Sequence, residues 1–475
     1  RGIGTVTAAS SVFGGGAVLA GSDVLCIRLY AKMSCADNLS SNCAVQVVDT
    51  SSRNALYSMD GAVFNSGSAD SIRNLHASSG WGGNSYTGTR VAAPFAILDS
   101  VYKIKQKIIA IDPNTVFQQL HLNWSVNNNL VSGSLSSGQI GGTFYTRLFN
   151  GSNIFILGDA NSDTDEYDEH IIIHEWGHYF EDRFSRSDST GGYHALIDYL
   201  DLRVAFGEGF GNAFSAMILG DPVYKDSQVA DPPDDVFDFN MEADICSPKG
   251  WYSECSVAEI LYDLYDTNNE GADALSLGLT PIYNVLMNEQ KTTPALTSIF
   301  TFITALKTYY SDPELTNINA LVNSHDIVSS TMDEYGATEI NDPSSTIDLT
   351  PVYIPVSPGQ TIPSLCTTNE FSQQYFLPDL LDIDNVNKLT SARFLKFIAG
   401  DTKSYTIIAS HISGANSPVL ALYGNTGKIM ERAGDSMTTP VLQAGAAYTI
   451  ESYDFLVSDD VSPSSSACYN ISVSN

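Results

Sequence analysis

The spacing of hydrophobic residues changes along the chain. Through residues 1–65, short runs alternate apolar and polar residues, a pattern typical of half-buried strands. Residues 92–112 then place apolar side chains at helical spacing, with Pro94 where the first turn tolerates it. Strand-like runs resume at 116–126, 141–149 and 153–159. The first part of the chain is therefore predicted to be β-rich, with one long helix.

Helical spacing dominates the middle of the chain. The predicted helices lie at 167–184, 207–220, 253–266, 293–310 and 312–324. After about residue 342 this pattern stops, 343–364 has the composition of a Pro/Ser linker, and short strand-like runs follow. We therefore expect an α+β protein with a β-rich segment at 1–65, a main domain at 66–345 and a β-sandwich at 346–475.

Composition narrows the classes of partner. The chain has 23 Lys and Arg against 54 Asp and Glu, a net charge of −31. Nucleic acids and anionic membranes would be repelled, which argues against both as partners. Hydrophobic residues make up 43% of the chain, so its acidity does not indicate disorder. No run of about 18 apolar residues is found, and we therefore expect no membrane-spanning helix.

Seven cysteines suggest disulfides rather than a cysteine metal site, because none forms a CxxC pair. Candidate pairs are Cys35 with Cys43, Cys246 with Cys255, and Cys366 with Cys468. Disulfides would indicate an oxidising compartment. Spacing alone leaves open the alternative of reduced, buried thiols in a cytosolic protein. Cys26 has no candidate partner, and it lies in a run in which apolar and polar residues alternate as in a half-buried strand.

One segment carries a metal-binding pattern. His174, Glu175 and His178 form H-E-x-x-H, and residues four apart lie on one face of a helix, so both imidazoles can reach one cation. Neutral imidazoles suit zinc, which needs a third protein ligand in a catalytic site. The candidate is Glu208, whose alternative interpretation is a surface acid at a helix N-terminus. His170 has Ile171 where the acid would stand, and we interpret it as a neighbour rather than a ligand.

HEWGHYFED followed by GEGFGNAF resembles the gluzincin metallopeptidases, particularly the fungalysin-like branch, over roughly residues 90–310. The resemblance implies a thermolysin-like two-lobed metallopeptidase domain with a β-rich N-lobe and a helical C-lobe. It also implies zinc held by His174, His178 and Glu208, with Glu175 as general base and proton shuttle. The expected activity is that of a zinc endopeptidase that hydrolyses protein or peptide substrates with a metal-activated water.

Two roles around this site stay open. Asn212, one turn after Glu208, can accept the second N–H of a ligating imidazole, although the family usually has Asp there. An oxyanion donor is also needed, but only one or two of the candidates can act, so for any single one the interpretation as a packed aromatic or a surface histidine is preferred. The candidates are Tyr193, His194, Tyr199, Tyr252 and His325. We further expect an edge strand within 123–129 or 151–159 to pair with an extended substrate.

Two acidic stretches are candidates for calcium, with plain solvated loops as the alternative. The first departs from a calcium-loop template at Thr164 and His170. Its candidate ligands are Asp159, Asn161, Asp163 and Asp165. Those of the second stretch are Asp234, Asp235, Asp238 and Glu242.

The C-terminal part resembles the pre-peptidase C-terminal domain of secreted bacterial peptidases through 396–410, 417–428 and 444–455, although Ser417 stands where an acid is commoner. We therefore expect a secreted or cell-surface, monomeric zinc endopeptidase. Two alternatives remain: a glycopeptidase restricted to glycosylated, mucin-like chains, and a non-catalytic, zinc-containing surface adhesin.

Overall fold

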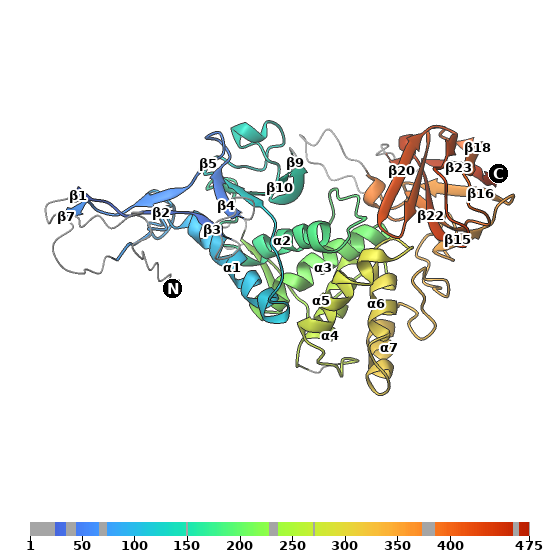
Figure 1. Ribbon diagram of the computed structural model, residues 1–475, viewed down its shortest axis with the longest axis horizontal. Coiled ribbons are helices and arrows are strands. Elements are labelled where there is room, and N and C mark those ends of the chain that lie inside the picture. The colour runs from blue at the N-terminus through green and yellow to red at the C-terminus, as the bar shows by residue number, and fades with distance from the viewer. Residues whose placement is uncertain are drawn as a thin grey trace. The chain divides into compact units, whose positions relative to one another are not determined.

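The computed structural model describes residues 24–34, 44–65, 74–148, 151–227, 236–268, 271–372, 385–458 and 465–474 (Figure 1). Contacts divide the chain into two compact units. The first comprises Arg1–Glu175 and Lys225–Phe237, and the second Trp176–Tyr224 and Asp238–Asn475. The boundary falls inside one continuous helix, α2 (Glu169–Phe184), which contributes residues to both units.

A six-stranded sheet is the framework of the first unit. Its strands are β3 (Lys32–Ser34), β4 (Ala44–Asp49), β8 (Leu120–Trp124), β10 (Gly151–Ile156) and β9 (Phe144–Leu148) in spatial order, with β5 (Ala55–Leu56) paired to β4. Strands β4, β8 and β10 run parallel, and β9 is antiparallel to β10. Because β8 and β10 each have a neighbour on both sides, the predicted edge strand at 123–129 or 151–159 is wrong. Among the described strands, β9 is an edge of this sheet.

Smaller pairings and one helix complete this unit. The pairs are β1 (Val24–Leu25) with β7 (Phe64–Asn65), β2 (Arg28–Tyr30) with β6 (Ser58–Asp60), and β11 (Gly158–Asp159) with β12 (Asp163–Thr164). Helix α1 (Ala93–Ile111) begins with Pro94 in its first turn and buries Ile97, Val101, Ile104 and Ile108, which confirms the predicted amphipathic helix. The exposed thiol of Cys26 lies in the alternating run that the sequence predicts.

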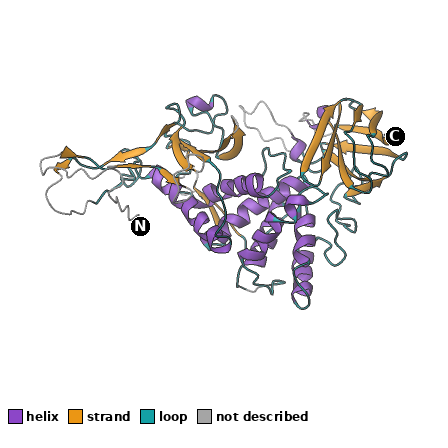
Figure 2. Cartoon of the chain, in the orientation of Figure 1, coloured by secondary structure: helices purple, strands orange, loops and turns teal. Residues whose placement is uncertain are grey.

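Helices dominate the middle region of the second unit (Figure 2). They are α3 (Leu202–Leu219), α4 (Glu254–Tyr265), α5 (Leu279–Met287), α6 (Ile299–Lys307) and α7 (Glu314–Ser324), and β13 (Val223–Ser227) pairs with β14 (Val236–Asn240). The sequence pattern missed α5. This nine-residue helix follows Gly278, which provides no side-chain cap, so its start carries no sequence signal. None of the described helices is both long and apolar enough to cross a membrane.

Two sheets form the C-terminal part. The first has the order β15 (Tyr353–Val356), β17 (Ala392–Ile398), β22 (Ala447–Asp454), β19 (Pro418–Gly424) and β20 (Gly427–Ala433). The second has the order β16 (Thr361–Thr368), β23 (Ser466–Ser474), β18 (Thr406–Gly414) and β21 (Ser436–Thr438). Both contribute to one hydrophobic core, for example through Leu395 and Ile450 from one sheet and Ile407 and Ile471 from the other.

The prediction of a Pro/Ser linker at 343–364 is partly wrong. Within 343–364, β15 pairs in parallel with β17, and the buried Tyr353 accepts a hydrogen bond from the backbone N–H of Leu296 (3.1 Å). Proline and serine at the strand ends hid this edge strand from the composition argument. The protein is thus a mixed α+β molecule with a helical middle region and a β-rich C-terminal part. The thermolysin-like lobes and the domain boundaries at 66 and 346 stay predictions.

Two of the three predicted disulfides are confirmed. Cys246 is bonded to Cys255, and Cys366 to Cys468, which joins β16 to β23. The expected pair of Cys35 and Cys43 lies outside the described residues. Disulfides of this kind form in oxidising compartments and are rare in the cytosol.

Candidate metal centre

Helix α2 presents the H-E-x-x-H residues from a well-buried position. Its apolar face, including Ile173, Trp176 and Phe180, is almost completely buried and fixes the rotation of the helix. His174 and Glu175 are buried, and the His178 side chain keeps 21% of its exposure. The two imidazoles are four residues apart and lie on one face.

Helix α3 brings the carboxylate to these imidazoles. The Asp201 side chain caps this helix by accepting the backbone N–H of Arg203 (2.9 Å). Glu208 therefore lies in the second turn and is buried, so the interpretation as a surface acid at the helix start is wrong. A Cβ on Gly177 would lie 3.3 Å from the Cα of Gly211, so glycine lets α2 and α3 approach closely here.

Three potential ligand atoms converge as a result. One nitrogen from each of His174 and His178 and one oxygen from Glu208 lie within 4.8 Å of one another. His178 Nε2 is 3.1 Å from Glu208 Oε2. Ligand atoms of a tetrahedral zinc with bonds of about 2.0–2.1 Å are separated by about 3.3 Å. Two imidazoles and one carboxylate are also a donor set of catalytic zinc sites, so these residues fit zinc.

A backbone donor of strand β9 holds Glu175. The N–H of Tyr145 donates to Glu175 Oε2 at 2.7 Å, and both residues belong to the first unit. The acid that follows His174 is therefore anchored to the edge strand of the sheet. This hydrogen bond fixes the orientation of the Glu175 carboxylate.

His194 is the oxyanion candidate that lies at the cluster. Its Nε2 is 3.1 Å from Glu208 Oε2, and its Nδ1 is 2.7 Å from Glu254 Oε2. Burial lowers the pKa of this imidazole, but the carboxylates of Glu208 and Glu254 outweigh burial and raise it well above the usual value. His194 therefore lies between two acids that favour its protonated form.

The other oxyanion candidates make contacts elsewhere. Tyr193 offers its carbonyl to the Lys388 ammonium (2.8 Å). Tyr199 and Tyr252 stack on each other, and the Tyr252 hydroxyl donates to Asn341 (3.1 Å). His325 is buried, and burial lowers its pKa to about 4. Its Nδ1 lies 3.7 Å from Glu259, so both groups belong to a separate buried cluster.

Two acids near the site escaped the sequence argument. Glu181, one turn after His178, has a carboxylate oxygen 3.5 Å from His178 Nδ1. Glu254 follows the Ser253 cap of α4 and reaches His194. A Cβ on Gly209 would lie 2.7 Å from the Glu254 carbonyl oxygen, so the close packing of α3 and α4 needs this glycine. The i+3 spacing from His178 was a usable signal for Glu181, whereas the contact of Glu254 is tertiary.

The remaining neighbours of the motif are buried. His170 lies one turn before His174 and is outside the convergent group of three. Asn212 is buried one turn after Glu208, and its role in orienting an imidazole stays a prediction.

The structure brings only some of the predicted calcium ligands together. Asp163 and Asp165 are buried and meet Asp226, which the sequence argument did not include. Asp159 instead accepts hydrogen bonds from the backbone N–H (3.0 Å) and side-chain amide (3.3 Å) of Asn161. In the second stretch, Glu242 accepts a hydrogen bond from Asn268 (3.1 Å). Asp238 lies on β14, and Asp234 and Asp235 lie outside the described residues.

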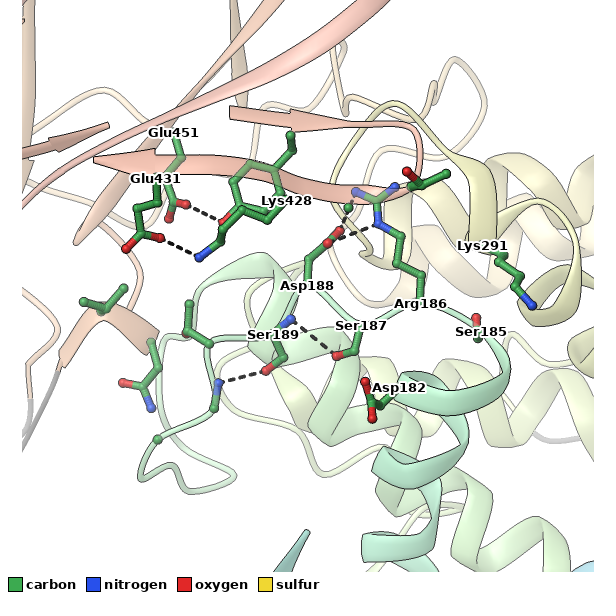
Figure 3. Close-up of a pocket in the computed structure, with 18 of the residues that line it drawn as sticks. Asp182, Ser185, Arg186, Ser187, Asp188, Ser189, Lys291, Lys428, Glu431 and Glu451 are labelled. Atoms are coloured by element: carbon green, nitrogen blue, oxygen red, sulfur yellow. Dashed lines mark hydrogen bonds and ion pairs between the residues drawn. The ribbon is translucent and has the colours of Figure 1, made fainter. Parts of the chain in front are cut away.

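A separate cavity of about 740 Å³ lies in the second unit (Figure 3). Its lining includes the segment after α2 and strand β20, and none of the three convergent residues. Its charges are largely paired, Arg186 with Asp188 (2.8 Å) and Lys428 with Glu431 (2.5 Å). The lining also includes Asp182, Lys291 and Glu451.

Comparisons with known proteins bear mainly on the central region. No curated protein sequence matches the chain. Among solved structures, one similar chain is that of Aeromonas hydrophila PliG, a periplasmic lysozyme inhibitor of g-type lysozyme, at 12% identity and a TM-score of 0.17. The match covers 26% of this chain and 95% of that one, and a TM-score this low carries no argument. Residues 115–314 match the family model described as the Mycolysin C-terminal domain. This region contains the whole convergent group, and the match is consistent with a metalloprotease.

Proposed function

We propose that this protein is a secreted, zinc-dependent endopeptidase of the gluzincin type. The observation that carries the proposal is the convergence of His174, His178 and Glu208, with Glu175 beside them on the same helix. The match of residues 115–314 to a mycolysin domain supports it independently. The fungalysin-like and thermolysin-like assignments belong to this proposal.

In the proposed reaction, zinc held by His174, His178 and Glu208 would supply a water that is acidic near neutrality and would polarise the substrate carbonyl. Glu175, oriented by the Tyr145 N–H, takes the proton of the attacking water and returns it to the departing amine. His194 donates from Nε2 to the carbonyl oxygen as that oxygen gains negative charge, while Glu254 holds its Nδ1. Each chemical role thus falls to a side chain whose orientation is fixed by a second group.

The edge strand β9 supplies a way to hold the substrate. An extended peptide that adds to this strand by main-chain hydrogen bonds would run beside Tyr145, whose N–H holds the base. This arrangement favours an endopeptidase, because peptide on both sides of the cleaved bond lengthens the segment that can pair with the strand.

The test compares hydrolysis and zinc content in matched variants. Glu175→Gln should keep zinc and lose about 10²–10⁴-fold in the rate of casein hydrolysis, because it removes only the base. Glu208→Ala should lose zinc. Glu169→Gln, the same change at a partly exposed acid of α2, is the control and should leave both unchanged.

The alternatives predict other outcomes. Cleavage of glycosylated but not bare peptides would replace the general endopeptidase with a glycopeptidase. Zinc binding without hydrolysis across a broad peptide library would indicate an adhesin. Loss of activity in Glu169→Gln equal to that in Glu175→Gln would remove the assigned role of Glu175.

A further inference from the structure

Three aspartates meet in the first unit, at Asp163, Asp165 and Asp226. One oxygen from each lies within 4.8 Å of the others. Asp163 and Asp165 are only 5% and 3% exposed, and Asp226 is half-buried. Like charges at this spacing repel strongly away from bulk water, so the group needs either protons or a bound cation.

One carboxylate oxygen in this group has no hydrogen-bond partner. Asp165 Oδ2 accepts the Thr143 hydroxyl, whereas the buried Oδ1 has none among the described residues. Buried polar atoms are nearly always satisfied, so an orphaned carboxylate oxygen on a residue that is grouped with two other acids points to a missing ligand. The neighbouring Arg90 does not compensate, because it is paired with Glu166 (2.6 Å).

The backbone around the group is tied in place. Asp168 accepts the N–H (3.2 Å) and hydroxyl (2.6 Å) of Ser227, which fastens β13 to the segment that follows β12. Asp226 is thereby held against Asp163 and Asp165. The Asp163 carboxylate in turn accepts the backbone N–H of Thr164 (2.8 Å). The three carboxylates are thus assembled from two distant parts of the sequence.

We propose that Asp163, Asp165 and Asp226 form a calcium site. Calcium takes six to eight oxygen ligands at about 2.3–2.6 Å in flexible geometry, and waters complete its shell, whereas magnesium demands a near-ideal octahedron.

The site also connects to the proposed active site. Thr143, which donates to Asp165, accepts the N–H of Leu157 (2.9 Å) and stands immediately before β9. The β9 residue Tyr145 holds Glu175. Calcium at Asp165 would therefore steady the strand that orients the base, a consequence that rests on the proposed function.

Calorimetric titration of the zinc-loaded full chain with calcium tests the site without any use of activity. The wild type should bind one calcium with Kd of about 10⁻³ M or tighter. Asp226→Asn should weaken binding by about 10–100-fold or more, because it removes a charged ligand from the half-buried edge of the group. Asp159→Asn is the matched control on the paired strand β11 and should bind as the wild type does.

Three results would overturn the assignment. They are the absence of calcium binding to the wild type at millimolar concentration, equal weakening by Asp159→Asn, and equal affinity for magnesium. If Asp226→Asn fails to fold, the melting temperature of the wild type decides: a rise with millimolar calcium that exceeds the rise with magnesium supports the site, and no rise refutes it. Zinc content and hydrolysis, measured separately, distinguish failure of this site from failure of the proposed function.

Discussion

Arg203→Met tests whether the C-terminal sheets are an integral part of the unit that carries Glu208. Arg203 lies on α3, is completely buried, and reaches Glu451 of β22 at 2.7 Å and Asp201 at 2.8 Å. Its guanidinium also donates to the Tyr423 hydroxyl (3.2 Å), which itself donates to Glu451 (2.7 Å). Methionine keeps much of the volume and removes the charge.

The magnitude follows from the two acids that remain. Loss of one partner of a buried ion pair typically costs about 3–5 kcal/mol in the free energy of unfolding, because the other charge stays buried. In a unit of this size, each kcal/mol of lost stability lowers the melting temperature by about 2 °C, so Arg203→Met should lower it by about 6–10 °C.

The effect should depend on pH with a defined sign. Burial raises the pKa of Glu451, but Arg203 outweighs it and holds this pKa below the usual value. In the wild type, the stability contributed by charged Glu451 is present above its unfolded pKa of about 4.3 and is lost as the pH falls through the lower folded value. Without Arg203 the carboxyl is protonated readily, so the difference between variant and wild type should shrink as the pH falls toward 4.

Scanning calorimetry measures this difference. Arg432→Met, at an exposed arginine of β20, is the control and should change stability by no more than about 0.5 kcal/mol. Addition of Glu451→Gln to Arg203→Met should recover part of the loss, because it removes one orphaned charge. A loss below about 1 kcal/mol, or a loss that does not vary with pH, would show that Arg203 does not stabilise the buried Glu451 carboxylate.

Three further predictions concern the site and its surroundings. His194→Phe should lower kcat by about 10²–10³-fold in steady-state kinetics with KM and zinc content nearly unchanged, and a parallel loss of zinc would contradict the donor role. The rise in melting temperature on calcium addition should grow from about pH 4 to about pH 7 and then level off. Burial and the charge of Asp226 raise the pKa of Asp163 to about 7, so a proton on Asp163 stabilises the calcium-free protein at low pH, and this contribution is lost as the pH rises through about 7. An equal calcium-induced rise in melting temperature at pH 4.5 and at pH 7.5 would refute this prediction. Replacement of both Cys246 and Cys255 by Ala should cost about 2–3 kcal/mol of stability in chemical unfolding. It should also lower kcat, because the disulfide holds the start of α4, which carries Glu254. An unchanged kcat would show that the disulfide does not position Glu254.

The predictable parts of this molecule are those governed by local rules. The 3.6-residue period predicted α1 and put His174 and His178 on one face, because helix geometry depends only on the sequence within a few turns. The disulfides that join Cys246 to Cys255 and Cys366 to Cys468 were also predicted correctly from sequence.

Long-range contacts set the limit of that approach. Asp226 joins Asp163 only because a strand that follows α3 folds back onto an earlier loop. Glu254 reaches His194 through the packing of α3 against α4, and the edge position of β9 follows from strand order rather than from composition. In the predicted linker, β15 gains its stability from pairing with β17, which no local pattern reveals.

X-ray absorption at the zinc edge measures the ligand shell of the proposed site. On the zinc-loaded full chain, we expect one zinc per molecule with four nitrogen or oxygen neighbours at about 2.0–2.1 Å, including scattering from two imidazoles. His178→Ala and Glu208→Ala should each lose stoichiometric zinc, while Glu169→Gln should keep it. A zinc shell without imidazole scattering, or stoichiometric zinc with an unaltered shell in Glu208→Ala, would rule out zinc held by His174, His178 and Glu208.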